Sequence, residues 1–170
     1  MCYLYRKCAI LIAPRNTPGK LILCIIQRMD DAYDLNRFLE AQKPVYARVC
    51  SELREGQKSS HWMWFVFPQI QGLGRSGMAQ RFAISSIEEA RAYLQHPVLG
   101  SRLRECAELV CAVKGRTIHE IFGSPDDMKF RSCVTLFARV DDQKHSVFER
   151  ALTKYFNGEP DELTLQLVSP

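Results

Sequence analysis

Hydrophobic residues recur along most of the chain with the spacing of α-helices. Near the start of the main body, apolar positions fall three or four residues apart and share one helix face: Leu35, Phe38, Leu39, Val45, Val49 and Leu53. Pro44 lacks a backbone N–H, so we expect it to kink this helix or split it in two, and Gly56 closes it. The pattern predicts one or two helices before residue 56.

Two further helices are predicted before Gly115. Ser85 and Ser86 each precede a glutamate by three residues, as in a capping box, and open a helix to about Gln95. Pro97 then begins a second helix, whose apolar stripe is formed by Val98, Leu99, Leu103, Cys106, Leu109, Val110 and Val113.

The last third of the chain predicts four more helical segments. A short turn of helix covers residues 117–122. Ser124 as N-cap, Pro125 as first helical residue and two following acids predict a helix to about residue 138. Another helix is expected over residues 146–156, stopped by Asn157 and Gly158, and a last one follows Pro160 and Asp161.

No stretch shows the sustained two-residue alternation of strands joined by hairpin turns. The sequence therefore predicts an all-α fold, a compact single-domain multi-helix bundle with short connections. The 170 residues are enough for one domain with its own core.

The first 28 residues differ from the rest of the chain. They hold five basic residues (Arg6, Lys7, Arg15, Lys20 and Arg28) and no acid. Met29 then opens a stretch typical of a helix start. We predict a basic N-terminal extension over residues 1–28, ahead of an all-helical domain over residues 29–170. Either Met29 is the true initiator, which we favour, or the extension is a targeting or membrane-touching arm.

Charge and cysteine content exclude several classes of protein. Taking the five early basic residues from the total of 23 leaves 18 against 19 acids, so the body is nearly neutral, which argues against nucleic-acid binding as the main function. Seven cysteines without a C-x-x-C pair indicate reduced thiols, and the four histidines lie far apart. No apolar run is long enough to span a membrane. We predict a cytoplasmic protein with no metal and no cofactor; its oligomeric state is left open.

The densest candidate segment runs from Ser60 to Gln69. Four of the eight residues from Ser60 to Phe67 are aromatic, among them Trp62 and Trp64. Such surface builds a core or forms a wall on which a planar ligand stacks. The core is the commoner outcome. If the segment forms a site, His61 and Gln69 would supply polar groups at its rim.

A glycine-rich segment, residues 71–81, follows directly. Its glycines free the backbone, Ser76 is placed to cap a helix, and Arg75 could clamp a phosphate or carboxylate, with Gly74 beside it. The spacing matches neither a Walker loop nor a dinucleotide fingerprint. A plain turn between helices is the simpler interpretation.

Lys129 and Ser132 form the third candidate site. They lie three residues apart and share one face of the helix that follows Ser124. Their order is the reverse of the S-x-x-K motif, so we favour hydrogen-bonding walls of a pocket over a nucleophile. Asp126 and Asp127 are interpreted first as helix-start residues.

These motifs resemble a widespread bacterial family of unknown function, the domain-of-unknown-function 1810 family, whose members are in places labelled calpastatin. The resemblance covers about residues 34–167, and the matching stretches are residues 38–42, 60–69, 72–76, 89–94, 96–100, 122–129 and 132–137. It implies an all-helical fold and no activity. The chain departs from the family pattern at Cys133 and Val134, where the family tends to Ser and Met.

A weaker similarity connects residues 38–43 and 151–156 with small helical hydrolases of ADP-ribose derivatives and related N-glycosides. Their final acidic and tryptophan-glycine segment has no counterpart before Pro170, which counts against shared chemistry.

We predict a protein that binds a phosphate-bearing, nucleotide-like or N-glycoside metabolite. If the protein is an enzyme, we expect it to hydrolyse that metabolite. Trp62 or Trp64 would stack on the ring, and Arg75 with its loop would hold the anion. Further polar contacts would come from His61, Gln69, Lys129 and Ser132. In an N-glycosidase Glu40 would be the acid or base, because an oxocarbenium-like centre needs a nearby carboxylate, and His61 is the second catalytic candidate. The alternative is a non-catalytic protein-interaction module.

Overall fold

The computed structural model describes residues 32–169. This range contains ten helices and no strand: α2 (Asn36–Gln42), α3 (Tyr46–Glu55), α4 (Met63–Val66), α5 (Gly77–Arg81), α6 (Ile87–Gln95), α7 (Leu99–Ala112), α8 (Ile118–Phe122), α9 (Asp126–Ala138), α10 (Val147–Phe156) and α11 (Glu162–Val168). The predicted single-domain all-α fold is confirmed. The predicted N-terminal extension lies outside the described residues.

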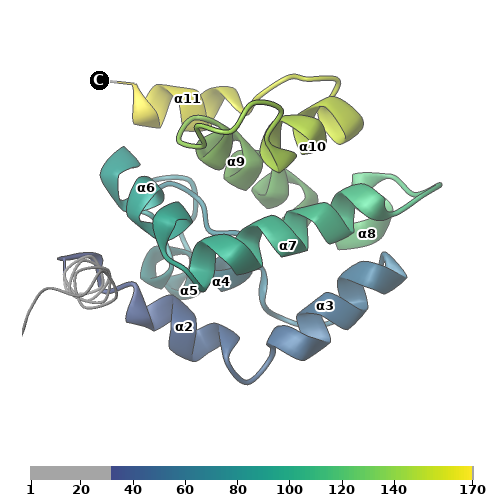
Figure 1. The fold of residues 1–170 in the computed structure, drawn as a ribbon, viewed down its shortest axis with the longest axis horizontal. Helices are drawn as coiled ribbons and strands as arrows, with labels where there is room; N and C mark the ends of the chain where they lie inside the picture. The colour runs from purple at the N-terminus through teal and green to yellow at the C-terminus, as the bar shows by residue number, and fades with distance from the viewer. Residues whose placement is uncertain (1–31, 170) are drawn as a thin grey trace, which may run out of the picture.

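Helix α7 runs through the middle of the bundle (Figure 1). It packs against α3, α6 and α10, while α9 contacts α8, α10 and α11. In Figure 1, α9, α10 and α11 lie on one side of α7, and α2 and α3 lie on the other. The predicted apolar stripe of α7 supplies the centre of the core, with Leu99, Leu103, Cys106 and Val110 fully or almost fully buried.

Several local signals act as the sequence predicts. Helix α2 ends at Gln42 and α3 begins at Tyr46, so the segment around Pro44 separates two helices. The hydroxyl of Ser86 caps α6 by accepting a hydrogen bond from the backbone N–H of Glu89. The Glu89 carboxylate bonds to the N–H and hydroxyl of Ser85, one residue before the cap.

The start of α9 differs from the prediction. Pro125 itself occupies the N-cap position, no side chain caps the helix, and the Ser124–Pro125 peptide is cis. The prediction of Ser124 as N-cap was wrong because Pro125 takes that position, which leaves the Ser124 hydroxyl one residue too early. Asp126 and Asp127 do lie in the first turn of α9.

Most of the aromatic segment lies in the core. Trp62, Phe67, Phe122 and Phe130 form a continuous group of edge-to-face and tilted ring contacts that joins α4, α8 and α9. Such contacts stabilise a core beyond the burial of their area. The segment therefore anchors the short helix α4 within the bundle.

Polar contacts fix α2 against the end of α5 and the residues that follow it. The guanidinium of Arg37 pairs with Glu89 at 2.6 Å and donates to the backbone oxygens of Arg81 and Ala83. The Gln42 side chain donates to the backbone oxygen of Phe65 at 2.7 Å. These bonds hold the ends of α4 and α5 in place.

Candidate functional site

A cavity of about 330 Å³ lies between α4 and the loop that leads into α5. We call it the Trp64 cavity. Its walls are formed by Trp64, Gln69, Ile70, Gln71, Gly72, Gly74, Ala79, Gln80, Phe82 and Ala83. The lining combines two aromatic rings with three glutamine side chains and contains no charged residue.

Local backbone contacts create this cavity. Ile70 and Ile84 form an isolated bridge, in which the N–H of Ile84 donates to Gln69 and the N–H of Gln71 donates to Ile84. The bridge closes the intervening residues into a loop that carries α5. A Cβ atom at Gly74 would lie 2.3 Å from the Cβ of Ala79, so only glycine allows this close approach.

The polar groups that line the cavity are neutral hydrogen-bond donors and acceptors. Each glutamine amide offers both an acceptor oxygen and a donor nitrogen, and Trp64 offers a half-buried aromatic face. No titratable side chain is present among the lining residues. The cavity therefore suits a neutral, planar, polar ring better than a bare anion.

Lys129 contacts Trp64 from α9. Its ammonium lies 5.0 Å from the centroid of the Trp64 ring and 2.7 Å from a carboxylate oxygen of Asp126. The other oxygen of Asp126 is 2.7 Å from the ammonium of Lys58. Burial opposes ionisation of Asp126, but the two lysines outweigh it and lower the pKa of this carboxyl. Lys129 thus connects α9 to the ring that forms the cavity wall.

Trp62 lies in the core and does not line the Trp64 cavity. Only 1% of it is exposed, and its indole N–H donates to the Glu52 carboxylate at 2.8 Å. Of the two predicted stacking residues, only Trp64 is placed at the cavity.

The structure brings three of the predicted binding residues together: Trp64, Gln69 and Gly74. Arg75 follows Gly74, is exposed, and makes no polar contact within the described residues. Gln71, Gln80 and Phe82 were not predicted as lining residues. Gln71 and Gln80 lie within the glycine-rich segment, whereas Phe82 lies outside it and lines the cavity only because of the fold.

The remaining predicted residues lie elsewhere. His61 is exposed and does not line the cavity. The single proton of the Ser132 hydroxyl is shared between the Met128 backbone oxygen at 3.1 Å and an Asp161 carboxylate oxygen at 3.0 Å, which joins the start of α11 to α9. The Trp62, Trp64, Arg75 and Lys129 side chains do not all converge on one concavity.

Glu40 lines a second depression, of about 540 Å³, which we call the Glu40 depression. Its other lining residues are Asp34, Asn36, Arg37, Ala41, Phe65, Met78, Arg81 and Phe82. Phe82 belongs to both lining sets, so the two hollows are neighbours.

The model of a family described as "protein of unknown function (DUF1810)" matches residues 32–168. The chain belongs to the DUF1810 family. Among solved structures, the conserved hypothetical protein Rv1873 from Mycobacterium tuberculosis is similar, with 55% sequence identity and a TM-score of 0.79. The similarity covers 81% of the present chain and 97% of that chain. The search of curated proteins gave no match.

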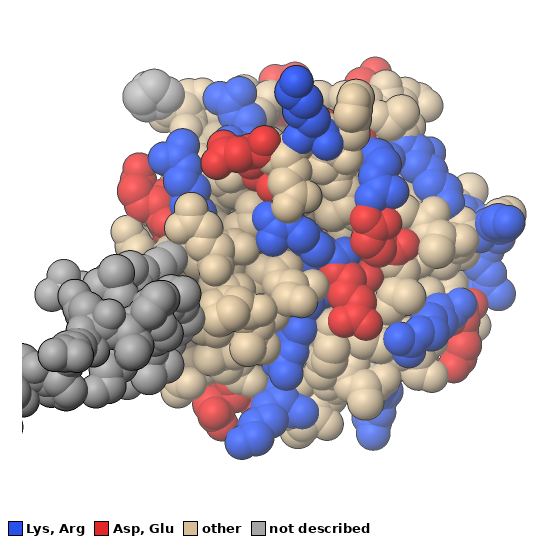
Figure 2. All heavy atoms as spheres, viewed as in Figure 1, with Lys and Arg blue, Asp and Glu red and all other residues tan. Residues whose placement is uncertain are grey.

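Three further properties of this DUF1810 chain bear on its partners. None of the helices between residues 32 and 169 has the length and hydropathy needed to cross a bilayer. Within the same range, no three His, Cys, Asp or Glu side chains group as a metal site would require. On the face shown in Figure 2, Lys and Arg are interleaved with Asp and Glu.

Proposed function

We propose that this DUF1810 protein binds a phosphate-bearing metabolite whose planar, nucleobase-like ring occupies the Trp64 cavity. The observation that carries the proposal is the composition of the cavity wall: Trp64 and Phe82 beside three glutamine amides, without a charge. Small-molecule sites are typically apolar or aromatic hollows with a few polar groups that fix orientation. A volume of about 330 Å³ is suited to one ring system and part of its substituent.

Two kinds of contact would hold the ring. Its face would stack on Trp64, and its edge would exchange hydrogen bonds with the Gln69, Gln71 and Gln80 amides. A glutamine amide matches the adjacent donor and acceptor of an adenine edge. Adenine derivatives are therefore the first ligands to test.

The anion of the ligand would be held by Arg75. This guanidinium is exposed, has no polar partner in the described part of the chain, and follows directly after the cavity residue Gly74. Arginine binds phosphate through two parallel hydrogen bonds. Lys129 would act differently, because its ammonium already contacts Asp126 and the Trp64 ring.

We propose that the protein binds this metabolite, and catalysis would need groups that the cavity does not contain. The Trp64 cavity presents no carboxylate or imidazole. Hydrolysis of an N-glycosidic bond with Glu40 or His61 as acid or base would require the ligand to extend beyond this cavity. The Glu40 depression is the neighbouring hollow that such an extension would enter.

Isothermal titration of the full chain with AMP tests the proposal. Loss of one stacking ring costs about 1–3 kcal/mol, so we expect Trp64→Ala to weaken AMP binding at least five-fold. Trp64→Phe, which keeps an aromatic face, should stay within about three-fold of wild type. Arg75→Ala should weaken AMP binding about ten-fold. Arg139→Ala is the matched control, since Arg139 is also exposed but lies at the end of α9.

Two results would overturn the proposal. One is the absence of binding heat for AMP, adenosine, ADP-ribose and ribose 5-phosphate. The other is binding that Trp64→Ala leaves unchanged. The protein-interaction module would then be the better hypothesis, and a specific surface favours it: Leu163 and Leu167 are 59% and 48% exposed, one turn apart on α11.

A further inference from the structure

Helix α5 differs from the other described helices in how little it is packed. It has five residues, Gly77–Arg81, and none of them is buried. Each of the other nine helices in residues 32–169 buries at least one residue. Segments with few buried contacts open locally at low free energy. Helix α5 is therefore the helix of this part of the chain that is easiest to displace.

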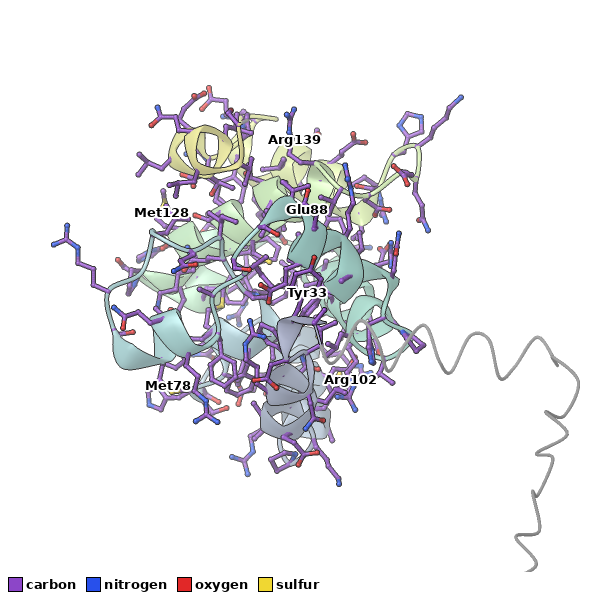
Figure 3. The ribbon with its side chains drawn as sticks, turned by 90° about the vertical axis from the view of Figure 1, so that its left-hand side faces the viewer. Tyr33, Met78, Glu88, Arg102, Met128 and Arg139 are labelled. Atoms are coloured by element: carbon purple, nitrogen blue, oxygen red, sulfur yellow. The ribbon has the colours of Figure 1, made fainter. Side chains whose placement is uncertain are left out.

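The same helix separates the two hollows. Ala79 and Gln80 line the Trp64 cavity, while Met78 and Arg81 line the Glu40 depression. Figure 3 shows Met78 at the edge of the molecule. Phe82, the residue that ends the helix, is 3% exposed and borders both hollows. Helix α5 and Phe82 therefore lie between the two hollows.

The hydrogen bond and ring contacts that join α5 to residues outside the 70–84 loop lie at its C-terminal end, whereas Ala79 packs against Gly74 within that loop. Arg37 donates from Nε to the backbone oxygen of Arg81 at 3.1 Å, and Phe82 is anchored by ring contacts with Phe38 and Phe65. At the other end, a Cβ atom at Gly77 would meet no atom within 4 Å. Helix α5 is therefore fixed at its C-terminal end, after Arg81, and has open space beside Gly77 at its N-terminal end.

We propose that the Trp64 cavity and the Glu40 depression are two halves of one binding groove, and that α5 is a displaceable wall between them. This inference rests on the proposed function. The planar ring of the ligand lies against Trp64, and a second portion of the ligand crosses Phe82 into the Glu40 depression when α5 moves.

The Glu40 depression has side chains suited to bind a hydroxyl-bearing part of the ligand. The side chains of Asp34, Asn36 and Glu40 line it and have no hydrogen-bond partner within the described residues. Their oxygens accept hydrogen bonds from hydroxyl groups. The Arg37 guanidinium is already paired with Glu89 and backbone oxygens, so it does not compete for an anion. A ring joined to a sugar, a nucleoside, has the chemistry of both halves.

Two substitutions change the mobility of α5 in opposite directions. Gly77→Ala adds a methyl group in open space and restricts the backbone at the unpacked end. Ser76→Ala removes the hydroxyl that accepts from the N–H of Ala79 and caps the helix. Ser101→Ala, on the exposed face of α7, is the control for a change of helix propensity elsewhere.

Titrations of adenine and adenosine with the full chain test the groove. We expect adenosine to bind at least ten-fold more tightly than adenine, and Glu40→Gln to remove most of that difference. Gly77→Ala should weaken adenosine binding about three-fold, because it lowers the population of the open state, and should leave adenine binding unchanged. Ser76→Ala should not weaken adenosine binding, and Ser101→Ala should change neither ligand.

The results that would overturn the groove differ from those that would overturn the proposed function. If both ligands bind equally and Glu40→Gln changes neither, the groove is overturned while the proposed function stands. If neither ligand binds, both fail. Amide hydrogen exchange gives a test without ligand: α5 should exchange at least ten-fold faster than the centre of α7, and equal protection would overturn the displaceable wall.

Discussion

Glu52 shows how one buried carboxylate can organise a turn. It accepts hydrogen bonds from the backbone N–H groups of Ser59 and Ser60, from the Ser60 hydroxyl and from the indole of Trp62. Burial opposes ionisation of this carboxyl, but the hydrogen bonds outweigh burial and lower its pKa to about 2. Glu52 therefore fixes the segment that leads into α4 and places Trp64 at the cavity.

Glu52→Gln should reduce the free energy of unfolding by about 2 kcal/mol at pH 7, because bonds to a charged acceptor are lost. The wild-type carboxyl has a lower pKa in the folded state than in the unfolded state. Its contribution is complete above about pH 5 and declines as the pH falls toward 2. Urea unfolding from pH 7 to pH 2.5 should show the two proteins converging, and a constant difference would contradict this account.

At the scale of elements, the Asp161 carboxylate is one of the groups that join α11 to α9. One oxygen of Asp161 accepts from the Ser132 hydroxyl at 3.0 Å, from the N–H of Thr164 at 3.1 Å and from the Thr164 hydroxyl at 2.5 Å. Asp161 is the N-cap of α11. The residue that caps α11 thus also attaches α11 to α9.

Asp161→Ala should increase amide hydrogen exchange throughout α11 and lower the local stability of that helix by about 1–2 kcal/mol, since a cap and an interhelical bond disappear together. Ser132→Ala, which removes one of the three donors, should have a smaller effect of the same kind. Exchange in α7 serves as the internal control. Equal exchange in α11 of wild type and Asp161→Ala would contradict the proposed attachment.

The longer helices and the short helix α8 were predictable from the sequence, whereas α4 and α5 were not. Helices α6, α7 and α10 carry periodic apolar residues together with start or stop signals such as Ser86 and Asn157. Helices α4 and α5 are four and five residues long, so they depend on surrounding contacts rather than on their own propensity.

The same limit applies to the candidate site. Trp64, Gln69 and Gly74 lie close in sequence, and their motifs singled them out. Phe82 and Gln80 join them only because the Ile70–Ile84 bridge closes the loop. A contact between two isolated residues leaves no periodic pattern, which is why sequence analysis missed most of the cavity wall.

At the scale of the whole molecule, Phe130 connects otherwise separate parts. It is fully buried, and its ring contacts Phe67, Phe122 and Phe156. These partners belong to or adjoin α4, α8 and α10, while Phe130 belongs to α9. The stability of the bundle should therefore respond as a unit to a change at this position.

Phe130→Ala should lower the free energy of unfolding by about 4 kcal/mol, through lost burial and the cavity left behind. Phe130→Leu, which keeps most of the volume, should cost about 1.5 kcal/mol. Urea unfolding followed by far-ultraviolet circular dichroism gives both values. A loss below 1 kcal/mol for Phe130→Ala would show that the aromatic contacts are dispensable.

The two tryptophans occupy contrasting environments, and this gives the protein an internal optical reference. Trp62 is enclosed beside a carboxylate, whereas Trp64 is partly open to solvent and lies beneath the ammonium of Lys129. Their fluorescence should therefore separate into a component at shorter wavelength, shielded from dissolved quenchers, and one at longer wavelength that quenchers reach. The first component reports the integrity of the core, and the second reports occupancy of the cavity, without any added label.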